Sequence, residues 1–64
     1  MPIVKIDLWE GLTFEQKEAL IGDVTEAVCK TTGAPAKAVF VLLNEVPREH
    51  WGIEGKPSSK KKFK

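Results

Sequence analysis

The chain has 64 residues, with ten basic and nine acidic side chains, so its formal net charge is +1 and its length allows at most one domain. A domain of this size buries only about 60% of its unfolded surface, which leaves a solitary monomer marginally stable. The single cysteine excludes a disulfide within the chain, and one cysteine with one histidine argues against a structural zinc site. Oligomerisation is the remaining support expected for so small a fold.

The charge distribution also limits the partners of the chain. Four lysines fall in the last five residues, and without them six basic groups face nine acidic ones, a net charge of −3. A mildly acidic body argues against a nucleic-acid partner. We expect the basic tail, at about 58–64, to be solvated, and attraction to a polyanionic surface is the alternative, non-enzymatic function. No apolar run approaches the ~20 residues of a membrane span and no secretory signal is apparent, so we expect a cytoplasmic protein without membrane contact.

The first expected element is a strand over residues 3–9. Apolar and polar positions alternate there, with Val4, Ile6 and Leu8 on one face. Pro2 precedes the strand, at a position where the missing backbone N–H of proline costs no hydrogen bond of the sheet. The segment therefore predicts a strand with one face against a core.

A helix is expected next, because Thr13 and Gln16 form a capping-box pattern. Gly33 stands where a left-handed residue ends a helix, and Pro35 prevents its continuation. Between these ends, apolar or small side chains recur at helical spacing at Leu20, Ile21, Val24, Ala27, Val28 and Thr31.

A second strand is expected at about 39–46, with apolar side chains on both faces. Strand, helix and strand predict a single α/β domain over residues 1–64, a βαβ protomer with parallel strands. One helix covers one face of two strands, so we expect dimerisation through the sheet, to four strands and two helices. Residues 48–57 are too short for a helix, and their glycines predict a tight hairpin or a short strand, which we expect to reach onto a neighbouring chain.

Three segments carry a family resemblance: MPIVKIDLW, EGLTFEQKEALI and HWGIEG. At this spacing they resemble the 4-oxalocrotonate tautomerase family, whose members are short βαβ chains with an amino-terminal proline as catalytic base. The resemblance implies an isomerase of the tautomerase type, a homo-oligomer, most simply a hexamer, and no cofactor. It implies a small carbonyl or enol compound as substrate.

The resemblance assigns catalysis to Pro2, once Met1 has been removed. An ordinary α-amine has a pKa of ~7.7–8.0, and burial beside apolar groups lowers such a value further. Acid–base catalysis is most efficient when the pKa of the catalytic group lies near the ambient pH. An amine of this kind can therefore take a proton from one atom of the substrate and return it to another. If Met1 is retained, Pro2 is only a structural residue at the start of the strand, without a catalytic role.

Two positions depart from the family pattern. The family has an arginine just before the helix cap and another on the second strand, and this chain has Leu12 and Phe40 there. Trp51 falls where the family has an aromatic residue, usually phenylalanine, that walls the proline pocket. With Trp9, these side chains predict an apolar substrate pocket.

Two explanations for the missing arginines stay open. In one, the enzyme acts on a less charged or more hydrophobic 2-oxo acid or enol, and a cation such as Lys5, Lys37 or Arg48 replaces the arginines. In the other, the chain is a catalytically weak subunit of a hetero-oligomer whose sister chain carries them. His50 is interpreted as a solvated or interface residue and Cys29 as a small buried side chain.

Overall fold

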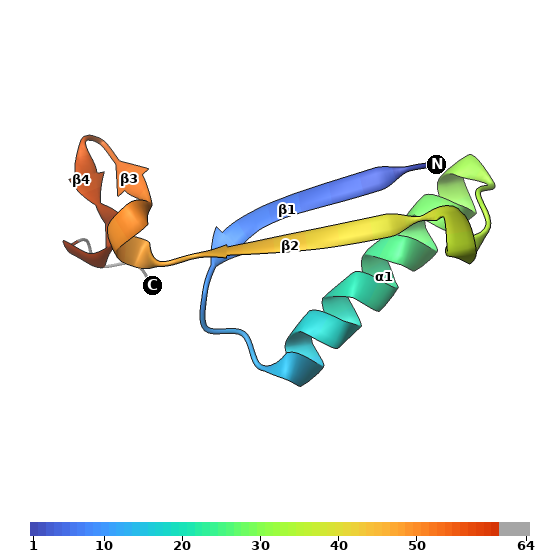
Figure 1. Cartoon of the computed structure of the whole chain (residues 1–64), viewed down its shortest axis with the longest axis horizontal. Helices are drawn as coiled ribbons and strands as arrows, with labels where there is room; N and C mark the ends of the chain where they lie inside the picture. The colour runs from blue at the N-terminus through green and yellow to red at the C-terminus, as the bar shows by residue number, and fades with distance from the viewer. Residues whose placement is uncertain (61–64) are drawn as a thin grey trace.

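The computed structural model describes residues 1–60 of the chain, and a parallel pair of strands joined by one helix forms its main body. The strands are β1 (Ile3–Trp9) and β2 (Phe40–Val46), and the helix α1 (Phe14–Thr32) connects them. Figure 1 shows α1 along one side of the two strands. The predicted βαβ unit is confirmed.

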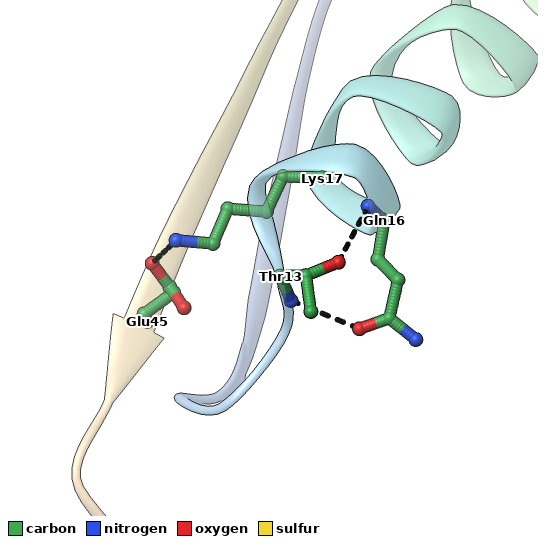
Figure 2. A network of polar contacts seen from close by, with 4 residues as sticks. All are labelled: Thr13, Gln16, Lys17 and Glu45. Carbon is green, nitrogen blue, oxygen red and sulfur yellow. Dashed lines mark hydrogen bonds and ion pairs between the residues drawn. The ribbon is translucent and has the colours of Figure 1, made fainter.

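The helix ends where the sequence predicts. The backbone N–H of Gln16 donates to Thr13 Oγ1 at 3.1 Å, and the Thr13 N–H donates to Gln16 Oε1 at 2.9 Å, which completes the capping box (Figure 2). At the other end Gly33 adopts a φ of 81°, and its N–H donates to the Cys29 carbonyl at 2.9 Å. A residue with a side chain rarely takes this left-handed conformation, which is why glycine stops the helix here.

The two faces of the β1–β2 sheet differ in their cover. The face toward α1 carries half-buried side chains, and Lys17 of the helix forms a 2.6 Å salt bridge to Glu45 on that face (Figure 2). The other face is open, and Ile3, Phe40 and Leu42 on it are 55%, 48% and 50% exposed. No apolar side chain within residues 1–60 is fully buried. The expected second strand with apolar residues on both faces is therefore confirmed, and a single protomer leaves one of these faces uncovered.

A separate hairpin follows the sheet. β3 (Gly52–Ile53) and β4 (Lys56–Pro57) pair with each other and not with β1 or β2, as predicted for this segment. The hairpin lies beyond the carboxyl ends of β1 and β2, at the end of the molecule opposite the amino terminus (Figure 1). The Cα radius of gyration, 14.7 Å, exceeds the value of about 11 Å for a compact domain of this length. The projecting hairpin thus adds little to the burial of its own sheet.

One part of the expected solvated tail is in fact structured. Residues Ser58–Lys60 form a 3-10 helix, and Ser58 is 0% exposed. Its backbone N–H donates to the Trp51 carbonyl at 2.7 Å, which draws the chain back onto the hairpin. The rest of the tail lies outside the described residues. No helix of residues 1–60 has both the length and the apolar character needed to cross a membrane.

Candidate active site

Pro2 and Phe40 lie together at the amino-terminal end of the sheet. The Phe40 N–H donates to the Pro2 carbonyl at 3.0 Å, and Phe40 is the register partner of Ile3. Pro2 thus extends the parallel pairing through its carbonyl, although it has no N–H to donate. Pro2 is half-buried, whereas the Met1 side chain is 85% exposed. The structure therefore brings together two of the predicted site residues, with Met1 projecting from them.

Trp9 and Trp51 form a second group at the carboxyl end of the strands. Their ring centroids are 5.9 Å apart, and the rings meet edge to face at 69°. The Arg48 guanidinium carbon lies 4.1 Å from the centroid of the Trp9 ring, within the range of a cation–π contact. Two aromatic side chains predicted for the pocket are therefore in contact, and a cation accompanies them.

Ser58 holds the segment that carries this second group. Its hydroxyl donates to the Arg48 carbonyl at 2.9 Å, and its N–H donates to the Trp51 carbonyl. The 3-10 helix Arg48–His50 and the residue after it are thus held at both ends by one buried residue. Nothing in the sequence identified Ser58, because a serine beside a lysine-rich tail carries no local signal of burial.

The two groups lie at opposite ends of one protomer. Seven residue steps separate Pro2 from Trp9 along β1, a path of roughly 23 Å at ~3.3 Å per residue. Figure 1 shows the same separation, with the amino terminus at one end of the strands and β3 and β4 beyond the other. Leu12 is half-buried in the loop that leaves the carboxyl end of β1. The predicted pocket residues are consequently not assembled around Pro2 within a single chain.

An open hollow of about 400 Å³ adjoins Trp51 on the uncovered face of the sheet. Asp7, Asn44 and His50 contribute to its lining, and the amide Nδ2 of Asn44 donates to Asp7 Oδ1 at 2.9 Å. Asp7 therefore has a partner on the neighbouring strand, whereas Lys5 is the register partner of apolar Leu42. Sequence reasoning missed Asn44, whose pairing with Asp7 depends on the register of the strands.

A second hollow of about 400 Å³ lies between α1 and β2 and does not include Pro2. Its lining is mostly apolar, with Phe14, Ile21 and Leu43 among the contributing residues. No cluster of three or more potential metal ligands occurs within the described part of the chain. Cys29 is half-buried on α1.

Comparison with known proteins agrees with this architecture. The family of tautomerase enzymes matches residues 2–61. A 2-hydroxymuconate tautomerase of Pseudomonas sp. strain CF600 is 48% identical over 60 residues, which are 94% of this chain and 95% of that protein. The crystal structure of TomN, a 4-oxalocrotonate tautomerase homologue in the tomaymycin biosynthetic pathway, matches with a TM-score of 0.91 at 32% identity, over 94% of this chain and 92% of TomN.

A heterohexamer 4-oxalocrotonate tautomerase from Chloroflexus aurantiacus J-10-fl also shares the fold, with a TM-score of 0.89 at 27% identity over 97% of this chain and all of that one. This βαβ chain is thus a tautomerase, an enzyme of the isomerase class. More narrowly, the chain belongs to the 4-oxalocrotonate tautomerase family. The family, the fold and the enzyme class expected from the sequence are confirmed.

Proposed function

We propose that the chain catalyses keto–enol proton transfer on a hydrophobic 2-oxo acid or its enol, with Pro2 as general base and then general acid. The observation that carries this proposal is the position of Pro2, half-buried at the start of β1 with its carbonyl fixed by Phe40. The hydrogen bond of the sheet uses the carbonyl and leaves the nitrogen for chemistry. Family membership supports the reaction type, since a relative is a 2-hydroxymuconate tautomerase.

The reaction requires the loss of Met1. A peptide-bonded proline nitrogen is a tertiary amide without a basic lone pair, whereas the freed terminus is a secondary amine. That amine takes the proton of the enol hydroxyl, the enolate oxygen forms the carbonyl, and the electron pair of the carbon–carbon double bond moves to the carbon next to it. The Pro2 ammonium then gives its proton to that carbon, so the charges and protons balance and no cofactor takes part.

The substrate site lies between chains in this proposal. Pro2 and Trp51 are at opposite ends of their own protomer, so the Trp9 and Trp51 rings border the Pro2 of a neighbouring chain. Cover for the open sheet face, with its half-exposed Ile3, Phe40 and Leu42, requires such a neighbour. We propose a dimer with a four-stranded sheet and further assembly to a hexamer, as a heterohexameric relative exists in the family.

The substrate class follows from the side chains that replace the two family arginines. Leu12 is half-buried and Phe40 is 48% exposed beside Pro2, so each presents apolar surface where the family has a cation. Charge-assisted hydrogen bonds contribute roughly 1.5–3 kcal/mol each, and their absence weakens the binding of a dicarboxylate. An alkyl or aryl enol acid is therefore the preferred substrate, and the cytoplasm is the proposed location of the reaction.

A second candidate function is favoured by the heterohexameric relative. In that case the chain is a weakly active subunit, and a sister chain with both arginines completes the site. Co-expression decides between the two candidates, because homo-oligomers active on aryl enol acids support the first and activity confined to mixed oligomers supports the second. Binding through the lysine-rich tail is tested in the same samples by salt-sensitive retention on a polyanion.

The decisive experiment concerns Met1 and Pro2. Intact mass of the cell-derived protein is expected to show Met1 absent, and protein that retains Met1 is expected to be inactive. Pro2→Ala should keep the fold, because alanine also has a carbonyl for the Phe40 bond, and should lower turnover ~10²–10⁴-fold. Pro35→Ala, a change outside the sheet, is the matched control. Undiminished activity with Met1 in place, or with alanine at position 2, contradicts the proposal.

A further inference from the structure

We propose that Arg48 is the cation that binds the substrate carboxylate in this chain, in place of the two arginines replaced by Leu12 and Phe40. The inference rests on the proposed function and adds to it the group that selects a monocarboxylate. Three features of the described residues support it: the stacking of Arg48 on Trp9, the absence of a competing anion, and the restraint of its backbone.

The stacking leaves the donors of Arg48 available. The guanidinium carbon lies 4.1 Å from the centroid of the Trp9 ring, so the cation rests on the ring while much of the residue stays exposed. A guanidinium on an aromatic face keeps the N–H donors at its edge directed outward, and these fit the two oxygens of a carboxylate. The Trp9 ring therefore orients the cation without occupying the donors that a ligand would use.

The cation also lacks a carboxylate partner in the described chain. Within residues 1–60 the salt bridge found is the one between Lys17 and Glu45, on the opposite face of the sheet. Arg48 forms no ion pair within residues 1–60, so no side chain described there neutralises its charge. An external carboxylate would supply the missing negative charge.

The backbone of Arg48 is held in place by a buried group. The Ser58 hydroxyl donates to the Arg48 carbonyl at 2.9 Å, and the Ser58 N–H donates to the Trp51 carbonyl at 2.7 Å. Ser58 is 0% exposed, so these bonds are shielded from water. Arg48 and Trp51 therefore keep a fixed relation, and a Trp51 that borders a neighbour's Pro2 brings Arg48 to the same pocket.

The other two cations considered from the sequence are less well placed. Lys5 stands on the open sheet face opposite Leu42, and Lys37 lies in the 3-10 helix Ala36–Ala38 that precedes β2. Neither has a hydrogen bond or an ion pair within residues 1–60 that would fix its ammonium group. In addition, the lysine ammonium group lacks the planar pair of N–H donors with which a guanidinium group binds both oxygens of a carboxylate.

The test compares an aryl enol of a 2-oxo acid with its methyl ester, which has no negative charge. Arg48→Gln is expected to lower kcat/KM for the acid ~10–100-fold, mainly through KM, and to leave the ester little changed. The kcat/KM of Arg48→Lys for the acid should fall between those of the wild type and Arg48→Gln, because lysine keeps the charge but loses the paired N–H donors. Lys30→Gln, on the last turn of α1, is the matched control, and sedimentation verifies that each variant assembles as the wild type does.

A binding measurement separates this inference from the proposed reaction. Phenylacetate is titrated against the cell-derived protein, with the fluorescence of Trp9 and Trp51 as the readout. If phenylacetate binds the wild type and binds Arg48→Gln ~10–100-fold more weakly, the inference is supported. If, in addition, no enol acid is converted, only the proposed reaction fails. Three outcomes would each overturn the assignment of Arg48: equal losses for acid and ester, no binding of phenylacetate, or unchanged binding in Arg48→Gln.

Discussion

Replacement of Leu42 by aspartate tests whether the open face of the sheet is the surface through which copies of the chain assemble. Leu42 is 50% exposed on that face, two residues along β2 from the likewise half-exposed pair Ile3 and Phe40. Its register partner is Lys5, so a carboxylate at position 42 has an opposite charge beside it within the protomer. The substitution therefore acts on assembly more than on the pairing of β1 with β2.

The expected effect follows from the exposed fractions. Complete burial of a leucine, isoleucine or phenylalanine side chain contributes about 1.5–3 kcal/mol, so cover for the exposed halves of Ile3, Phe40 and Leu42 contributes roughly 2–5 kcal/mol per protomer. Leu42→Asp removes about 1 kcal/mol of this and adds the desolvation of a carboxylate, several kcal/mol in an interface. At 1.4 kcal/mol per factor of ten, the association constant falls at least ~100-fold.

Sedimentation velocity and urea unfolding at several protein concentrations measure the effect. The wild type is expected to sediment well above 7.1 kDa, with an unfolding midpoint that rises with concentration. Leu42→Asp should shift toward smaller species, whereas Ala19→Asp, which adds the same charge at an exposed position of α1, should not. A wild-type monomer that unfolds cooperatively at micromolar concentration, or a Leu42→Asp variant that assembles normally, would refute this reasoning.

The remaining predictions concern the substrate and the local structure. Phe40→Arg is expected to raise kcat/KM for an unsaturated dicarboxylate ~10–100-fold in steady-state kinetics, since it restores a charge-assisted hydrogen bond beside Pro2. Ala19→Arg, which adds the same charge at an exposed position of α1, should give no gain, and an equal gain in both variants or none in Phe40→Arg would contradict the role of position 40. Thr13→Ala should lower the free energy of unfolding by ~0.5–2 kcal/mol through loss of the capping box, and urea titration beside Thr31→Ala, which makes no such cap, measures it. Ser58→Ala should lower it by ~0.5–1.5 kcal/mol and broaden the tryptophan emission, because the Arg48 carbonyl loses its donor; an unchanged spectrum and midpoint would show that this bond contributes nothing.

Local signals in the sequence determined the elements of this protein. The alternation in residues 3–9 gave β1, and the Thr13, Gln16 and Gly33 pattern marked both ends of α1, because capping hydrogen bonds close within a few residues of the chain. The apolar residues on both faces of the second strand likewise predicted an uncovered sheet face, which the exposure of Phe40 and Leu42 confirms. The candidate residues Pro2, Leu12, Phe40, Trp9 and Trp51 came from the resemblance, and their roles stay predictions.

Only the tertiary structure decided which of these residues meet. Because β1 and β2 are parallel, the amino-terminal ends of both strands lie at one end of the sheet and their carboxyl ends at the other. Phe40 is therefore bonded to Pro2, while Trp9 lies the length of a strand away. The contacts of Trp9 with Trp51 and Arg48, and the burial of Ser58, depend on how the segment after β2 packs at the carboxyl end of the sheet. Such contacts join residues up to 42 positions apart in the sequence (Trp9 to Trp51), and no short-range pattern encodes them because they arise from register and packing.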